Sequence, residues 1–248
     1  MLQIASIRLM ILALALASVG CQGLTPGKAE WVRADSDQPR AGNVYLIRGL
    51  IGVFSTGMDD LAVKLNERGI RAHVFQDAQH SLLSDAIIRN YRDKPNREPL
   101  VLIGHSYGAD GVVRAARAVG EKGIEVDLLI TLDPTIPPNV PRNVKATYDF
   151  FQPQPTDFIP LFRGVPLKQD PDATGKLVNI DLRKDRRDLL DAGTNHINID
   201  KSPKVHEEIL RLVMEVCPPR NEWLARRGLP PAPPNPAPAS AGNPGGSK

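Results

Sequence analysis

A short apolar run leads directly into the pentapeptide GHSYG at residues 104–108, and this junction constrains the fold more than any other segment. Residues 100–103 predict a buried strand, and residues 110–119 predict a helix. A serine between such a strand and such a helix occupies a sharp turn with its hydroxyl exposed at the carboxyl end of the strand. The flanking glycines let strand and helix approach each other. Ser106 is therefore the candidate catalytic nucleophile; the alternative is a glycine-rich turn with a purely structural role.

Strand and helix patterns alternate over residues 41–217, the predicted folded domain. We expect strands at 43–48, 71–75, 100–103, 126–132, 145–151 and 177–182, and helices at 58–68, 81–91, 110–119 and 203–217. Such alternation requires right-handed crossovers and a mostly parallel sheet with helices on both faces. We therefore predict an α/β fold, a three-layer α/β/α sandwich with about six to eight strands. Ligands bind such sheets at the carboxyl ends of the strands, where the turn puts Ser106.

A serine hydroxyl needs an imidazole to accept its proton and a carboxylate to orient that imidazole. In this type of fold the chain order is serine, then acid, then histidine. His196 fits, because it lies in a loop between the last predicted strand and the last predicted helix. His105 is adjacent to the serine, and we expect it to point away and either to support the residues of the site from behind or to pack. The remaining histidines lie in a strand, ahead of the serine in the chain, or inside the last helix (His73, His80 and His206).

The predicted acid is Asp133, which ends an apolar strand and precedes Pro134. A carboxylate at the carboxyl end of the strand after the serine strand is well placed to meet the imidazole. The competing candidate is Asp157, which lies in a proline-rich stretch after the following strand, the more usual position for the acid in this fold. Either aspartate has an alternative role in capping a turn.

Two backbone N–H groups must hold the oxyanion of the reaction. The N–H of Tyr107 comes with the serine turn. The second donor is expected from the loop after the first strand, where Gly49 lets the chain turn close to the site. This favours the N–H of Leu50, with Ile51 as the next candidate.

With these residues in place, the chain resembles the α/β-hydrolase superfamily over about residues 40–217. The resemblance rests on Arg48-Gly49, the pentapeptide 104–108, Leu132-Asp133-Pro134 and Asn195-His196. It implies hydrolysis of carboxylic esters or thioesters through an acyl-enzyme, without a cofactor, by an esterase, lipase or thioesterase. An acid after the strand that follows the serine strand is similar to the thioesterase and some lipase branches. The sequence departs from lid-bearing members of the superfamily: only about residues 152–176 form a long segment near the site, so we expect a minimal lid.

Three alternatives to this function stay open on sequence alone. An amidase or an acyltransferase would use the same residues. A non-catalytic envelope lipoprotein would use the same fold as a binding module for its partner. The partner expected here is a small acyl ester or thioester. A net charge of +3 with scattered basic residues gives no reason to expect a nucleic-acid partner, and no cysteine or histidine spacing predicts a metal site.

The N-terminus predicts export. Residues 1–20 form a signal peptide whose apolar core, 9–17, is too short to span a membrane. Small residues before Cys21 resemble the lipobox of bacterial lipoproteins, so Cys21 is the candidate lipidation site, and a lipid there would anchor the protein in the envelope, at the outer membrane or in the periplasm. The alternative is ordinary secretion to the periplasm or medium, in which Cys21 can pair with Cys217.

Two further segments flank the predicted domain. Residues 21–40 are expected to form a linker after the signal peptide. Residues 218–248 are expected to form a disordered proline-rich tail, because Pro, Ala, Gly, Asn and Ser cannot bury a core, with residues 220–228 able to form one last turn.

Overall fold

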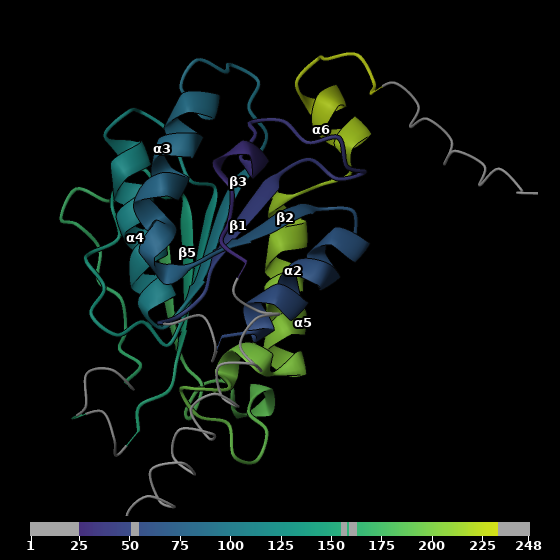
Figure 1. Ribbon diagram of the computed structural model, residues 1–248. Helices are drawn as coiled ribbons and strands as arrows, with labels where there is room; N and C mark the ends of the chain where they lie inside the picture. The colour runs from purple at the N-terminus through teal and green to yellow at the C-terminus, as the bar shows by residue number, and fades with distance from the viewer. Residues whose placement is uncertain (1–24, 51–54, 155–157, 159–162, 233–248) are drawn as a thin grey trace, which may run out of the picture.

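The computed structural model describes residues 25–50, 55–154, 158 and 163–232 (Figure 1). Its centre is one parallel sheet of six strands in the order β2-β1-β3-β4-β5-β6. The strands are β1 (Asn43–Ile47), β2 (Arg71–Phe75), β3 (Leu100–His105), β4 (Leu128–Leu132), β5 (Ala146–Phe151) and β6 (Lys176–Asp181). The predicted α/β sandwich with a parallel sheet is confirmed.

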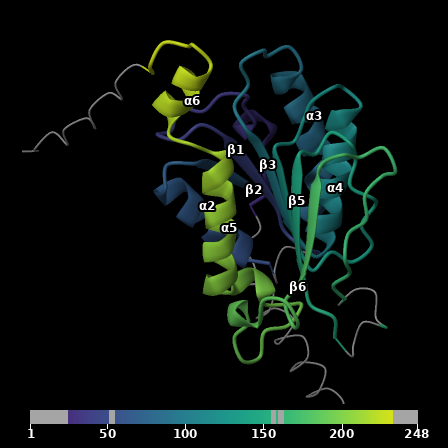
Figure 2. The same cartoon turned by 180° about the vertical axis from the view of Figure 1, so that it is seen from behind.

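Helices cover both faces of this sheet (Figures 1 and 2). They are α2 (Gly57–Glu67), α3 (His80–Tyr91), α4 (Tyr107–Gly120), α5 (Pro203–Val216) and α6 (Arg220–Arg226). Short 3-10 helices lie at Ala29–Trp31 (η1), Asp77–Gln79 (η2), Arg187–Leu189 (η4) and Ile199–Lys201 (η5). The α-helix and strand bounds differ from the predicted ones by three residues at most; α4 differs most, since it begins at the residue after Ser106.

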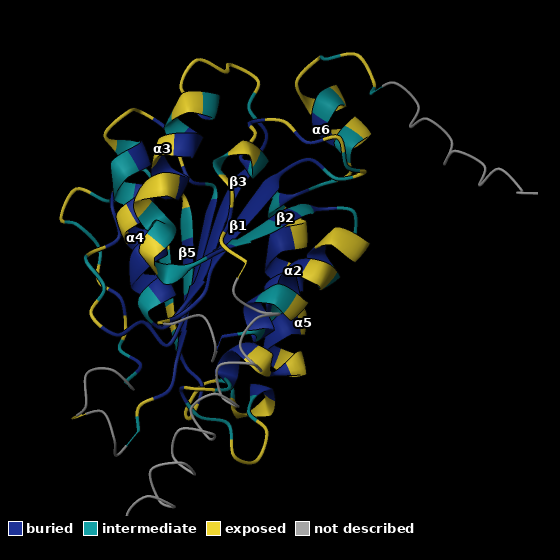
Figure 3. Ribbon diagram, in the orientation of Figure 1, coloured by how far each residue is buried: buried dark blue, intermediate teal, exposed yellow. Residues whose placement is uncertain are grey.

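Alternate side chains of each central strand serve two separate cores, as the two-residue period of a strand requires. On β1, Val44 and Leu46 pack with α2 and α5, whereas Tyr45 and Ile47 pack with α3 and α4. The central strands are buried along their whole length (Figure 3). A sheet covered on both faces leaves only its strand ends for function, and the carboxyl end is where the loops carrying the predicted site residues begin.

Helix α5 begins as its sequence predicts. The Ser202 side chain accepts a hydrogen bond from the N–H of Val205, and Pro203 occupies the first turn. The capped first turn of α5 fixes the end of the preceding loop, which carries His196.

The packed unit extends beyond the predicted domain at both ends. Val32 and Ala34, within the predicted linker, are buried in the core. Helix α6 buries Trp223, and the backbone of Arg40 forms an antiparallel bridge with Pro219. The signal peptide, Cys21 and residues 233–248 of the tail lie outside the described residues. Within the part of the chain that the structure describes, no helix has the length and apolar character needed to cross a membrane.

Candidate active site

Ser106 sits in a strained turn between β3 and α4. Its backbone has φ 57° and ψ −125°, a region that costs a non-glycine residue about 1–3 kcal/mol. The two glycines of the pentapeptide are needed on steric grounds. A Cβ on Gly104 would overlap the Gly108 carbonyl, and a Cβ on Gly108 would overlap two carbonyl oxygens at the end of β1. The turn therefore aims the serine out of the carboxyl end of the sheet.

His196 lies in the loop between β6 and α5, as predicted, and its ring reaches back over the serine. The distance between Ser106 Oγ and His196 Nε2 is 2.9 Å, which is a hydrogen bond. Both residues are buried, with 6% and 5% of their surface exposed. This is the geometry in which a neutral imidazole can accept the hydroxyl proton.

Asp133 lies on the other side of the imidazole. It follows the last residue of β4 with φ 45°, and its Oδ2 lies 3.6 Å from His196 Nδ1. That distance is slightly longer than a hydrogen bond, as is common for catalytic contacts without a substrate. The competing candidate, Asp157, lies outside the described residues. The structure thus brings together Ser106, His196 and Asp133.

Gln152 holds the Asp133 carboxylate, a contact that the sequence analysis missed. The Gln152 backbone N–H donates to Oδ1 at 2.8 Å, and its side-chain Nε2 donates to Oδ2 at 3.2 Å. Arg183 in turn donates to the Gln152 side-chain oxygen at 3.2 Å. Burial raises the pKa of Asp133, while the contacts with His196 and Gln152 oppose this rise. The signal in the sequence is an amide directly after β5, at the carboxyl end of the strand beside β4.

The loop after Asp133 is fixed by a second aspartate. Asp110, in the first turn of α4, accepts hydrogen bonds from the Thr135 N–H, the Thr135 hydroxyl and the Ile136 N–H at 2.7–3.0 Å. The segment that begins at Arg163, part of the predicted lid region, also packs here, since Arg163 Nε donates to the Thr135 carbonyl at 2.8 Å. The acid therefore stands on a loop with fixed backbone.

Another buried carboxyl group, Asp149 on β5, neighbours Asp133. It accepts hydrogen bonds from the Thr131 hydroxyl at 2.7 Å and from the Leu167 N–H at 3.3 Å. Burial, reinforced by the charge of Asp133, raises the pKa of Asp149 well above its ordinary value. Burial and the neighbouring Asp133 charge both disfavour the ionised form of Asp149.

The two predicted oxyanion donors belong to segments that lie next to Ser106. Tyr107 is the first residue of α4. On the opposite side, a Cβ on Gly49 would lie 3.1 Å from the Ser106 Cβ, so the loop after β1 passes close to the serine. The N–H of Gly49 donates to Ser55 Oγ at 3.0 Å, so it is not available to hold an oxyanion. Leu50 is the next residue of this loop, while Ile51 lies outside the described residues.

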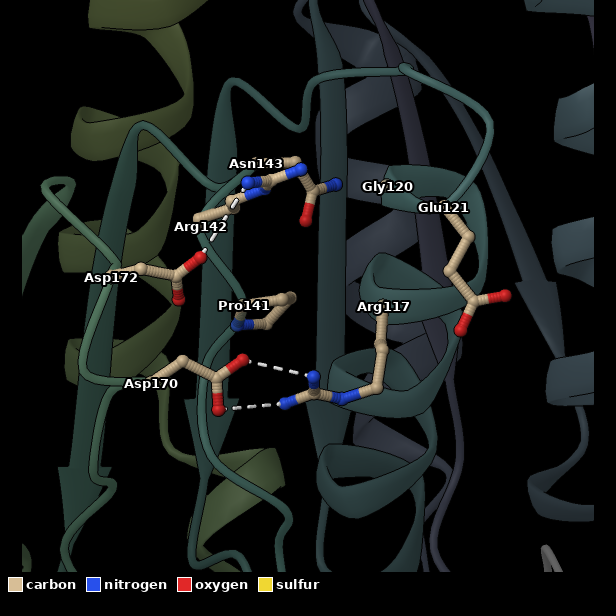
Figure 4. A pocket seen from close by; sticks show the side chains of 8 residues that line it. All are labelled: Arg117, Gly120, Glu121, Pro141, Arg142, Asn143, Asp170 and Asp172. Carbon is tan, nitrogen blue, oxygen red and sulfur yellow. Dashed lines mark hydrogen bonds and ion pairs between the residues drawn. The ribbon is translucent and has the colours of Figure 1, made fainter.

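A polar surface pocket lies at the opposite end of the sheet (Figure 4). It is lined by the last turn of α4 and by the segments that lead into β5 and β6 (Arg117, Gly120, Glu121, Pro141, Arg142, Asn143, Asp170 and Asp172). Its arginines form ion pairs with its aspartates, Arg117 with Asp170 at 2.9 Å and Arg142 with Asp172 at 3.6 Å. Among the described residues, no group of three or more His, Cys, Asp or Glu side chains is arranged to hold a metal ion.

No protein-family model matches the chain, and no curated protein matches it in sequence. Several solved structures are similar in fold. Est1E from Butyrivibrio proteoclasticus shares 15% identity over 72% of this chain and 89% of that chain, with a TM-score of 0.43. The esterase domain of a Rhodothermus marinus protein shares 15% identity over 74% and 90%, with a TM-score of 0.41. The NocB thioesterase domain from the Nocardicin cluster shares 13% identity over 71% and 93%, with a TM-score of 0.40. Likeness at this level does not assign an activity, so the function is inferred from the geometry of the site.

Proposed function

We propose that this protein is a serine hydrolase that cleaves carboxylic esters or thioesters through an acyl-enzyme. The observation that carries the proposal is the 2.9 Å hydrogen bond between Ser106 Oγ and His196 Nε2, with the serine on a strained strand–helix turn. Backbone strain of this kind persists only where the surrounding structure imposes it, and it is concentrated at functional sites.

In the proposed acylation, Ser106 Oγ attacks the carbonyl carbon of the substrate while His196 Nε2 takes the hydroxyl proton. The N–H groups of Tyr107 and Leu50 hold the oxygen that becomes negative. Asp133 orients the imidazole and stabilises its positive charge. When the tetrahedral intermediate collapses, His196 returns the proton to the departing alcohol or thiol, and the acyl group stays on Ser106.

Deacylation repeats these steps with water. His196 removes a proton from a water molecule, the resulting hydroxide attacks the acyl-enzyme carbonyl, and the proton passes to Ser106 Oγ as the acid leaves. Every proton transfer in both halves uses the same imidazole nitrogen, so the proposal needs no cofactor. The substrate is a small acyl ester or thioester.

Turnover of model substrates tests this proposal. The full chain is assayed with a chain-length series of p-nitrophenyl esters and acyl-CoA thioesters, alongside Ser106→Ala and Ser84→Ala. Ser84 is the matched control because it is also a buried serine, on α3, and its hydroxyl donates to the carbonyl of Ser81 in its own helix. We expect Ser106→Ala to lower kcat by at least about 10³-fold and Ser84→Ala to leave it near the wild-type value. Equal turnover by wild type and Ser106→Ala would overturn the proposal, and an inert wild type would favour a binding module.

We also propose that the protein is exported and carries a lipid on Cys21. The support is the sequence alone: an apolar core of nine residues, 9–17, followed by small residues before the cysteine. Expression in a bacterium with a lipoprotein pathway tests this. Cys21→Ala is expected to move the protein from the membrane fraction to the soluble fraction, while Cys217→Ala leaves it in the membrane fraction. A membrane-bound Cys21→Ala protein would contradict lipidation.

A further inference from the structure

His105 makes two hydrogen bonds that the proposed reaction does not use. Its position beside the serine in the sequence predicted a side chain that points away from Ser106 and either supports the site from behind or packs. It is buried, with 2% of its surface exposed, but both of its ring nitrogens have partners. Nε2 lies 2.8 Å from the backbone carbonyl oxygen of His196, and Nδ1 lies 2.7 Å from Ser55 Oγ. Its role is therefore more than packing, because one partner is the main chain of the proposed base.

The proton positions follow from the partners. A carbonyl oxygen can only accept, so His105 Nε2 carries the hydrogen. Burial, together with the nearby His196, lowers the pKa of His105 to about 3, so the ring is neutral and its Nδ1 is an acceptor. Ser55 must then donate its hydroxyl hydrogen to Nδ1, and Ser55 Oγ accepts the N–H of Gly49 at 3.0 Å. Each hydrogen bond of this chain has one possible direction.

This hydrogen-bond chain connects the two loops that flank Ser106. At one end is Gly49, whose N–H is bonded to Ser55 Oγ and which directly precedes the proposed oxyanion donor Leu50. At the other end is the backbone of His196, 91 residues from His105 in the sequence. The rings of His105 and His196 are 5.4 Å apart between centroids and tilted by 41°, so the two side chains also contact each other.

We propose that His105 is a positioning residue that holds Gly49, next to the proposed oxyanion donor Leu50, and the proposed base, His196, in their working positions around Ser106. This inference rests on the proposed hydrolase function. His105 does not act on the substrate itself. Its Nε2 holds the backbone of His196, from which the proposed base projects. Its Nδ1 holds the Ser55 hydroxyl, which in turn accepts the N–H of Gly49. Displacing a reacting group by about 1 Å can cost about 10²-fold in rate.

His206 offers a matched control. It is also a buried histidine, and its Nε2 donates to a backbone carbonyl of the same loop, that of Asp200, at 2.6 Å. Its Nδ1 faces Lys64 on α2 at 3.0 Å, whereas that of His105 faces Ser55. Replacing either histidine by phenylalanine removes a buried hydrogen bond of the same type, but only His105→Phe removes the one that holds His196.

The experiment measures kcat and KM on the preferred model ester for His105→Phe, His105→Gln and His206→Phe. Glutamine carries a donor and an acceptor, so it can keep both links. We expect His105→Phe to lower kcat about 10- to 100-fold while KM stays within about twofold of the wild-type value. His105→Gln is expected to have most of the wild-type kcat. His206→Phe is expected to have a kcat near that of the wild type. A melting temperature for each variant separates lost stability from lost rate.

Ser55→Ala is the second test. It removes the two hydrogen bonds of Ser55 Oγ, with Gly49 and with His105, but leaves the His105 ring and its hydrogen bond to the His196 carbonyl in place, so it is informative even if His105→Phe fails to fold. We expect it to lower kcat about 3- to 10-fold. The positioning role is overturned if His105→Phe loses no more kcat than His206→Phe, if only KM changes, or if Ser55→Ala equals wild type. If Ser106→Ala loses turnover but His105→Phe keeps it, only the positioning role of His105 is overturned. If the wild type itself shows no turnover, the proposed hydrolase function is overturned as well.

Discussion

Ser106 Oγ and His196 Nε2 lie 2.9 Å apart although 90 residues separate them in the sequence. The parallel sheet produces this proximity. Ser106 follows β3 in the middle of the sheet, and the loop that carries His196 returns from the edge strand β6 to reach it. The 2.9 Å contact therefore depends on the residues that hold these two loops in place.

Asp133→Asn tests the assignment of the acid. Asparagine keeps the shape of the side chain but removes the charge that orients and stabilises the imidazole. We expect kcat to fall about 10³- to 10⁴-fold, since the same change in a serine protease triad costs about 10⁴. Asp157→Asn is the control and is expected to stay near wild type in the same ester assay. The opposite result, with Asp157→Asn inactive, would transfer the role of acid to Asp157.

Gln152→Ala tests the contact that holds Asp133. The variant loses the Nε2 donor at 3.2 Å but keeps the backbone N–H donor at 2.8 Å. Hydrogen bonds to the charged carboxylate lower its pKa, so removing one raises the pKa of Asp133 further. Because the reaction needs the ionised form, we expect the acid limb of the kcat/KM profile to move to higher pH. A profile that overlays the wild-type curve would show that the side chain of Gln152 does not tune the acid.

Two glycines of the same helix, α4, should respond oppositely to alanine. A Cβ on Gly108 would overlap backbone carbonyls at the end of β1, which cannot move aside, whereas the nearest atom to a Cβ on Gly111 is 3.5 Å away. We expect Gly108→Ala to lower the free energy of unfolding by at least about 2 kcal/mol. Gly111→Ala should leave it unchanged or raise it by up to about 1 kcal/mol, because alanine favours the helix. Urea denaturation of both variants measures this, and equal effects would contradict the proposed steric requirement at the turn.

Asp200 predicts a pH dependence of stability. Its Oδ2 accepts the N–H of Gly57 at the start of α2, and burial raises its pKa from 3.8 to about 7. The folded protein then holds a proton that the unfolded chain releases between about pH 4 and pH 7. The free energy of unfolding should therefore fall as pH rises across this window, by about 4 kcal/mol at most, and level off above it.

Asp200→Asn removes this titration. Urea denaturation at several pH values should show that wild type loses stability relative to Asp200→Asn from pH 4 to pH 7. Parallel pH profiles of the two proteins would mean that Asp200 does not hold a proton in the folded state.

The sequence was sufficient for the α/β architecture, and it pointed to Ser106, Asp133 and His196, which the structure brings together. Strand and helix patterns are local, and each of these three residues lies at or near the end of a predicted strand or in the loop before a predicted helix. The contacts that hold them were missed for a physical reason. Gln152 contacts Asp133 only because β5 lies beside β4, and His105 reaches the His196 carbonyl only because the last loop folds back over β3. Such contacts depend on the sheet order and the loop path, which no local pattern encodes.

Reaction with a fluorophosphonate, followed by peptide mass spectrometry, tests the central claim most directly. The reagent phosphonylates a serine only where the hydroxyl is activated by a base and the oxyanion is held. We predict one adduct on wild type, on the peptide that contains Ser106, no adduct on Ser106→Ala, and strongly slowed labelling of His196→Ala. An unlabelled wild type, or an adduct on another serine that persists in Ser106→Ala, would contradict the assignment of Ser106 as the nucleophile.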